Sequence, residues 1–308
     1  MFENPMSQTL RALLAAGLML ATTTALAADR PPHDPRDAGG GRCAKSAYNC
    51  VDTKNPLPKT SEIWIEKMTW LDVRDAMADG KKTIIIPTGG VEPNGPWVAL
   101  GKHNYALQTN REAIARKLGN ALCAPIVPFV PEGDFDPPSG HMDTVGTISL
   151  QESTFEALLS DIVTSFKIHG FERIFLIGDS GGNLKGMDAV AHKLNTQWQA
   201  APLVAHLPEY YEYNSVYDFL RKKGVMKEGL VSDNVHDDPA VEIEVMGADP
   251  DAVRWKERVK ANLATIDGVS IKDKKQMAQW AKEVAEFRAT NTVAAMQKAI
   301  ANKGGLAP

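Results

Sequence analysis

The sequence predicts a three-layer α/β fold, in which helices cover both faces of a mostly parallel central sheet. Two observations support this prediction. Residues 83–87 and 173–177 are short, continuously apolar runs, and glycines follow both of them. Between such runs lie segments with apolar residues at helical spacing. Continuous apolar strands that alternate with amphipathic helices are typical of parallel sheets buried on both faces.

The expected elements follow one another along the chain. They are a strand over 83–87, a helix over 104–118, a strand over 122–130, a short strand into 147–149, a helix, a strand over 173–177, a second helix, a strand over 203–206 and mainly helices after Tyr210. Ser149 and Glu152 fit an S-x-x-E capping box at the start of the helix that precedes the strand over 173–177. That helix is the clearest, because six apolar residues share one face: Phe155, Leu158, Leu159, Ile162, Val163 and Phe166.

Composition narrows the class of protein. The chain has 308 residues, of which 44% are hydrophobic and 23% charged, with a formal net charge of -4. These values are ordinary for a soluble globular protein. The sequence has no basic patch, so we expect a small-molecule partner and no nucleic acid.

The N-terminus has the pattern of a secretory signal. Arg11 precedes an apolar run over 12–21, and residues 25–27 (A-L-A) fit a cleavage site. We therefore expect a signal peptide over 1–27, an irregular Pro- and Gly-rich arm over 28–59 and a single domain over 60–308. This predicts a secreted or periplasmic protein without membrane contact after cleavage, the alternative being an uncleaved anchor.

The three cysteines fall into two groups. Cys43 and Cys50 lie close together in a polar segment, where an oxidising compartment would allow them to pair; the sequence leaves the pairing open. Cys123 lies in an apolar run and is expected to be a buried core thiol.

Two glycine-rich exits from predicted strands carry the first candidate residues. Glu92 follows the strand over 83–87, and His103 opens the next helix. A carboxylate and an imidazole at adjacent loop ends are able to share a metal ion, the alternative being a turn cap and a backbone hydrogen bond. Ligands of open α/β sheets bind at the carboxyl ends of the strands, which is where both residues are expected.

The second exit reads G-D-S-G-G and contains Asp179 and Ser180. It matches the G-x-S-x-G nucleophile elbow in the expected context, between a strand and a helix. A serine hydrolase would complete this motif with His236 and either Asp218 or Asp233. The alternative is a tight turn in which Asp179 and Ser180 cap the next helix.

Two further loops contain polar residues of the right kinds. Residues 233–238 read D-N-V-H-D-D, a set able to bind a metal or to orient a histidine, or else a solvated loop that ends in a helix cap. His141 lies in a Pro- and Gly-rich loop and is a candidate for substrate contact, or for a hydrogen bond to a turn.

Taken in order, these segments resemble the creatininase family of metal-dependent amidohydrolases, from about Trp70 to about Pro250. The matching pieces are G-G-V-E-P-N-G-P, L-G-K-H-N, G-H-M-D-T-V-G-T-I-S-L, H-G-F-E-R-I-F-L-I-G-D-S-G-G-N and V-H-D-D. At these places the family has E-Q-H-G-P, a T-D pair, G-T-I-S-L, N-G-H-G-G-N and H-A-G-E.

The resemblance also shows departures at the family's metal ligands. The family's first glutamate corresponds to Glu92, but its first histidine falls on Asn94, its aspartate on His103 and its second histidine on Ser180. Its final acidic ligand has three candidate positions, which are Asp237, Asp238 and Glu242.

The resemblance implies hydrolysis of a C–N bond in a small amide, cyclic amides included, by water activated on a divalent Zn, Mn or Fe ion, in a homo-oligomer. The predicted roles are metal binding by Glu92, His103, His236 and Asp237, catalysis by Asp179 and Ser180, and substrate binding by Asn94, His141 and Asp238. Two alternatives stay open: a serine esterase or amidase that uses Ser180, and a non-catalytic periplasmic binding protein that kept the fold.

Overall fold

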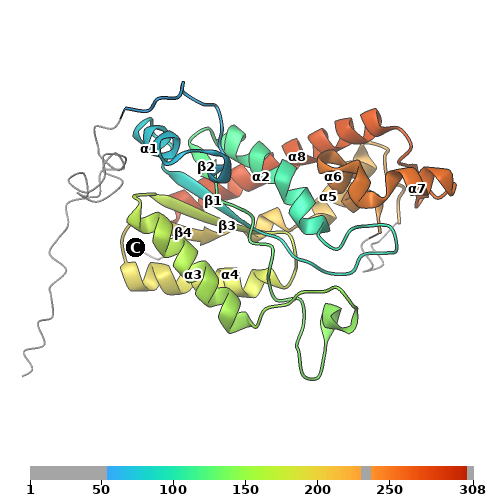
Figure 1. The fold of residues 1–308 in the computed structure, drawn as a ribbon, viewed down its shortest axis with the longest axis horizontal. Helices are drawn as coiled ribbons and strands as arrows, with labels where there is room; N and C mark the ends of the chain where they lie inside the picture. The colour runs from blue at the N-terminus through green and yellow to red at the C-terminus, as the bar shows by residue number, and fades with distance from the viewer. Residues whose placement is uncertain (1–53, 230–236, 304–308) are drawn as a thin grey trace, which may run out of the picture. The chain divides into compact units, whose positions relative to one another are not determined.

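A four-stranded parallel sheet forms the centre of the computed structural model, which describes residues 54–229 and 237–303 (Figure 1). The strand order is β2-β1-β3-β4. The strands are β1 (Thr83–Thr88), β2 (Ala121–Cys123), β3 (Arg173–Gly178) and β4 (Leu203–His206). Ile84 at the centre pairs with Leu122 on one side and Ile174 on the other, and all three are fully buried.

Helices cover both faces of this sheet, as Figure 1 shows, with α3 and α4 on one face and α2 and α8 on the other. The helices are α1 (Trp70–Ala78), α2 (Lys102–Leu118), α3 (Glu152–Ile168), α4 (Asn183–Trp198), α5 (Tyr213–Lys222), α6 (Pro239–Ala248), α7 (Trp255–Lys260) and α8 (Lys274–Ala301). A small antiparallel hairpin of β5 (Thr265–Ile266) and β6 (Val269–Ser270) precedes α8. The predicted three-layer α/β class is therefore confirmed.

The C-terminal helices form a second apolar cluster. Val216 and Leu220 of α5, Ile243 of α6 and Val284 of α8 are buried together there. Helix α8 belongs to both clusters, because Ala289 and Met296 further along it pack against the sheet. This long helix therefore ties the C-terminal layer to the sheet and fixes the position of α2, against which it packs.

The structure corrects three of the predicted elements. The short strand expected over 147–149 forms only isolated bridges, at Ile148 and Ser149. The strand expected over 122–130 ends at Cys123, and beyond it Val127 and Val130 make only isolated bridges. Ser149 does not cap α3, which begins at Glu152 after Gln151. Its hydroxyl instead accepts from Glu132 N at 2.9 Å and donates to Gly133 O at 2.7 Å. The capping box is absent because this hydroxyl stabilises the turn after Val130.

The β4 end of the sheet is closed by a side chain. Asn195 of α4 donates from Nδ2 to Val204 O at 2.6 Å and accepts at Oδ1 from Val204 N at 3.0 Å. The amide thereby satisfies a donor and an acceptor of β4, as a neighbouring strand would.

Cys123 is fully buried, as expected, and burial raises the pKa of its thiol to about 12. Cys43, Cys50 and the predicted signal peptide lie outside the described residues. In the described part of the chain, no helix combines the length and apolar character needed to cross a bilayer.

Candidate active site and metal centre

The carboxyl ends of β1 and β3 bring Glu92 and Asp179 into one buried cluster. Asp179 follows β3 directly, and Glu92 lies four residues beyond β1. His103, in the first turn of α2, joins them. Its Nε2 is 2.9 Å from Glu92 Oε1, and its Nδ1 is 3.0 Å from Asp179 Oδ2. The two glycine-rich exits therefore share one site, with an imidazole between their carboxylates.

Glu92 is the centre of this network. Its Oε1 also accepts from Lys102 Nζ at 2.6 Å, and its Oε2 lies 3.2 Å from His141 Nε2. The side chains of Glu92 and Lys102 are each only 2% exposed. The two carboxylate oxygens of Glu92 thus have different neighbours, a lysine and His103 on one and His141 on the other.

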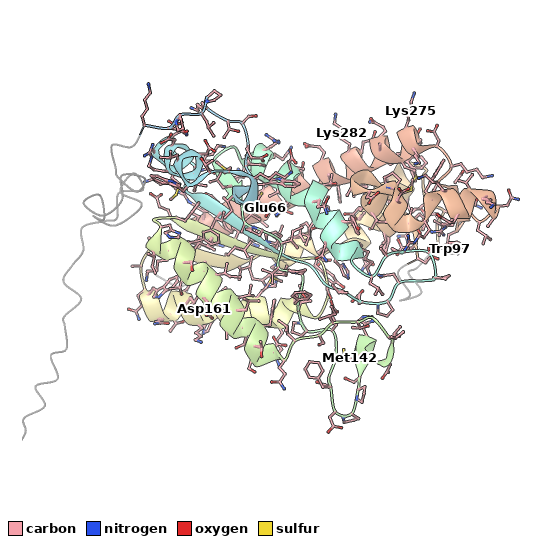
Figure 2. All side chains as sticks on the ribbon, viewed as in Figure 1. Glu66, Trp97, Met142, Asp161, Lys275 and Lys282 are labelled. Atoms are coloured by element: carbon pink, nitrogen blue, oxygen red, sulfur yellow. The ribbon has the colours of Figure 1, made fainter. Side chains whose placement is uncertain are left out.

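His141 reaches this site from a long loop. It lies in the short 3-10 helix η5 (Gly140–Asp143). Figure 2 shows the next residue in sequence, Met142, on a loop that extends away from the sheet. The backbone of His141 is held near the site, because its N–H donates to Glu132 O at 2.9 Å.

Glu132 is the residue that the sequence prediction missed. Its Oε2 accepts from Ser180 Oγ at 3.1 Å, while its Oε1 is buried without a hydrogen-bond partner among the described residues. A Cβ at Gly90 would lie 2.2 Å from that oxygen, so a side chain there would displace the carboxylate from its present position. A signal existed in the sequence: Glu132 closely follows the apolar run over 122–130, much as Glu92 follows 83–87.

Glu92, Glu132 and His141 form a candidate cation site. One ligand atom from each lies within 4.8 Å of the others. Two carboxylates and an imidazole suit Zn and Mn alike, and the unpartnered Glu132 Oε1 is an oxygen that a cation would satisfy. All three residues open onto a cavity of ≈ 440 Å³ that also admits a small molecule, and Ser180, Lys185 and Tyr211 line it too. The residues present therefore fit one divalent ion.

The electrostatics of the two glutamates are opposite. Burial alone would raise the pKa of Glu92, but the hydrogen bond and charge of His103 and the charge of Lys102 outweigh it, so that this pKa is lowered. Burial and the neighbouring Glu92 raise the pKa of Glu132 to about 9. Burial also lowers the pKa of Lys102, against the opposing effect of Glu92. Glu132 therefore keeps a proton at neutral pH unless a cation replaces it.

The structure gives several predicted residues other roles. Both ring nitrogens of His103 face carboxylates, so it braces Glu92 and is not in the cation group. Asn94 donates from Nδ2 to Glu92 O at 2.8 Å and Ala99 O at 3.2 Å, which holds the Glu92 loop, and its predicted substrate contact stays a prediction. His141, expected to bind substrate, lies in the cation group instead.

The last predicted loop is only partly described. Asp238 is the N-cap of α6, where it accepts from Ala240 N and Val241 N, rather than a substrate contact. Asp237 is 3.3 Å from Arg258 Nη2 and is not a member of the cation group. His236 lies outside the described residues, so its predicted metal contact stays a prediction.

The serine-hydrolase alternative gains little from the geometry. Ser180 Oγ donates to a carboxylate, Glu132, and Asp218 is an exposed residue of α5 paired with Arg221. Its other proposed partners, Asp233 and His236, lie outside the described residues.

Comparison with known proteins identifies the family of this chain. The family model for creatinine amidohydrolase matches residues 66–306. A curated relative, 3-dehydro-scyllo-inosose hydrolase from Thermotoga maritima, is 23% identical over 155 residues. That alignment covers 50% of this chain and 47% of the relative, so the chain matches about half of the relative's length.

Solved creatininase structures share the fold. A mutant creatininase has a TM-score of 0.59 at 17% identity, covering 77% of this chain and 98% of its own. A mutant complexed with creatine has a TM-score of 0.54 at 18% identity, covering 79% and 99%. A mutant described as the Zn-Zn type has a TM-score of 0.52 at 18% identity, covering 80% and 99%. With the family model matched over 66–306, this chain belongs to the creatininase family of amidohydrolases.

Proposed function

We propose that this protein hydrolyses a C–N bond in a small amide, cyclic amides included, with water activated on one divalent metal ion. The observation that carries the proposal is the convergence of Glu92, Glu132 and His141 on one cavity at the carboxyl ends of the strands. Membership in a family of amidohydrolases supports the type of bond.

Glu92, Glu132 and His141 would hold the ion, with Zn, Mn or Fe as the metals that this mixed set suits. A bound ion of this kind lowers the pKa of water and polarises a carbonyl group. Solved relatives described as Zn-Zn and Mn forms of creatininase support a metal of this kind.

The surrounding residues hold these donors in place. His103 fixes Glu92 from one side and is itself fixed by Asp179, which also accepts from Tyr213 OH at 3.2 Å. Ser180 fixes Glu132 with its hydroxyl. Partners of this kind restrict the rotation of metal-binding side chains and preserve their geometry between turnovers.

The cavity limits the size of the substrate. Its volume of ≈ 440 Å³ is near the lower end of the range for small-molecule sites, which run from roughly 300 to 1,000 Å³. Creatine in one related structure and an inosose in the name of another relative are small molecules as well, which supports a substrate of this size.

The test is metal analysis together with hydrolysis assays on a panel of small cyclic and linear amides, creatinine included. We expect a bound divalent ion in the wild-type protein, and loss of both ion and activity in Glu132→Gln. Asp218→Asn, which changes an exposed carboxylate of α5, is the matched control and retains both.

Two outcomes of the same experiment favour the alternatives. A metal-independent activity that disappears in Ser180→Ala, together with labelling of Ser180 by a fluorophosphonate, identifies a serine hydrolase. Tight binding of small molecules without turnover of any amide, lactone or ester identifies a binding protein.

We also propose that the protein acts outside the cytoplasm and as a homo-oligomer. The pattern of Arg11, the apolar run over 12–21 and the A-L-A site supports the first proposal. The resemblance to an oligomeric family supports the second, which light scattering coupled to size-exclusion chromatography tests directly.

A further inference from the structure

The lysine at the start of α2 is in an unfavourable place for a cation. Lys102 is the first residue of this 17-residue helix, where the helix dipole disfavours positive charge. Its side chain is also only 2% exposed, and burying an ammonium without compensation is costly. Its presence therefore needs a specific explanation, which its neighbours provide.

The ammonium is held by the carboxylates of the candidate metal centre. Lys102 Nζ lies 2.6 Å from Glu92 Oε1, and the charges of Asp179 and Glu132 also act on it. Glu92 is thereby shared: Oε1 accepts from Lys102 and lies 2.9 Å from His103 Nε2, whereas Oε2 lies 3.2 Å from His141. A metal ion at Oε2 has donors around it, but an ion at Oε1 meets the ammonium.

We propose that Lys102 is a built-in cation that occupies the place of a second metal ion at Glu92, so that this centre holds one divalent ion. The inference rests on the proposed function, because it assumes that Glu92, Glu132 and His141 bind a metal. It concerns this chain in particular, since the solved relative of the Zn-Zn type is named for two ions.

The geometry also predicts what happens without the ammonium. If Lys102 is replaced by an uncharged residue, Glu92 Oε1 loses its nearest partner, at 2.6 Å, while His103 Nε2 remains 2.9 Å away. With Asp179 accepting from its Nδ1, His103 would then offer Nε2 as a ligand, an arrangement common for metal-bound histidines. The position of the ammonium therefore becomes a second site with a carboxylate and an imidazole donor.

The experiment counts metal ions per chain, by mass spectrometry and by titration calorimetry with Zn²⁺ or Mn²⁺. We expect one equivalent in the wild-type protein and two in Lys102→Met, whose side chain is of similar length but uncharged. Lys102→Arg keeps the charge and should stay at one equivalent. Lys185→Met removes an exposed lysine from the same cavity and, as the matched control, should also stay at one.

The outcomes separate this inference from the proposed function. Two equivalents in the wild-type protein or in Lys102→Arg overturn the inference and leave metal-dependent hydrolysis intact, and so does a single equivalent in a folded Lys102→Met. If Lys102→Met does not fold, two equivalents in the wild-type protein or in Lys102→Arg still overturn the inference. One equivalent without hydrolysis of any amide contradicts the proposed function alone, and no metal in any variant contradicts both.

Discussion

Two buried ionic clusters lie on helix α2, and they differ in how completely their charges are paired. The structural cluster is formed by Asn110, Tyr210, Glu244 and Arg288. Arg288 binds Glu244 Oε1 through Nη2 at 3.0 Å and Tyr210 O through Nη1 at 2.6 Å, and Asn110 donates to Glu244 Oε2 at 2.6 Å. None of these four residues has a buried side-chain atom without a partner in the described part of the molecule.

The cluster at the sheet edge is built differently. Its three carboxylates, Glu92, Asp179 and Glu132, face one ammonium and two imidazoles, and Glu132 Oε1 is buried without a partner among the described residues. It also opens onto a cavity, whereas Glu244 and Arg288 are each 2% exposed in side chain and line none of the cavities described. A site for an additional cation requires carboxylates whose charges are incompletely paired and that open onto a cavity. The comparison therefore assigns the functional role to the cluster at the sheet edge and a structural role to the cluster around Arg288.

The largest expected effect comes from breaking the sheet-edge cluster at its centre. Glu92→Gln removes one cation ligand and the charge that pairs with Lys102 and His103, so we expect amide hydrolysis to fall by more than the roughly 10–100-fold typical of losing a residue that only supports a metal ligand. Metal content, measured by mass spectrometry, should fall as well. The circular dichroism spectrum should remain that of the folded wild-type protein. Wild-type turnover in this variant would show that Glu92 has no part in the chemistry.

Breaking the structural cluster should lower the free energy of unfolding and leave metal binding unchanged. Arg288→Met leaves Glu244 buried without its charge partner, which costs about 3–5 kcal/mol of unfolding free energy. Denaturant titration measures the loss, and metal content should remain that of the wild-type protein. Adding Glu244→Gln removes the uncompensated charge and should restore much of the stability; a metal loss in either variant would undermine the distinction between the two clusters.

A smaller effect is expected from the carboxylate behind His103. Asp179→Asn keeps the size of the side chain but weakens its hold on Nδ1 of His103, so we expect metal affinity or activity to fall by about 10–100-fold. Tyr213→Phe removes only the hydroxyl that donates to Asp179 and should have a weaker effect in the same direction. Equal activities of wild type and Asp179→Asn would remove Asp179 from the positioning network.

A further expected effect is a pH dependence of stability in the presence of a chelator. Glu132 has an ordinary pKa of 4.5 and a pKa of about 9 in the folded protein. A carboxyl group whose folded pKa is raised stabilises the fold fully below 4.5 and loses that contribution as pH rises through about 9. The melting temperature should therefore decline over this interval, by roughly 2–4 °C for each kcal/mol lost.

Glu132→Gln supplies the control, since its neutral amide resembles the protonated carboxyl group. The decline should flatten in this variant. If wild type and Glu132→Gln show the same slope, another group is responsible for the pH dependence.

The sequence predicted the sheet and its two exits well, because these depend on local patterns. Continuous apolar runs identified β1, β3 and β4, and the glycines that follow β1 and β3 indicated where Glu92 and Asp179 would lie. The rule that parallel strands share a carboxyl edge then brought the two residues together. Fold class and the location of the site were therefore accessible without coordinates.

Individual roles in the site were less accessible, because they depend on contacts between distant segments. Glu132 and Ser180 are 48 positions apart, and the carboxylate of Glu132 lies where a side chain at position 90 would displace it. Lysine is ordinarily a surface residue, and the burial of Lys102 follows from packing between segments that the local sequence pattern does not reveal. His103 was expected to be a ligand, but two carboxylates on different loops occupy both of its nitrogens.

The amide of Asn195 has a consequence for the behaviour of the molecule in a crowded solution. Exposed strand edges are templates onto which foreign strands add, and aggregation often starts from them. Here the backbone of Val204 is already engaged from within the same chain. A single apolar substitution, Asn195→Leu, would leave these two backbone groups available to a foreign strand.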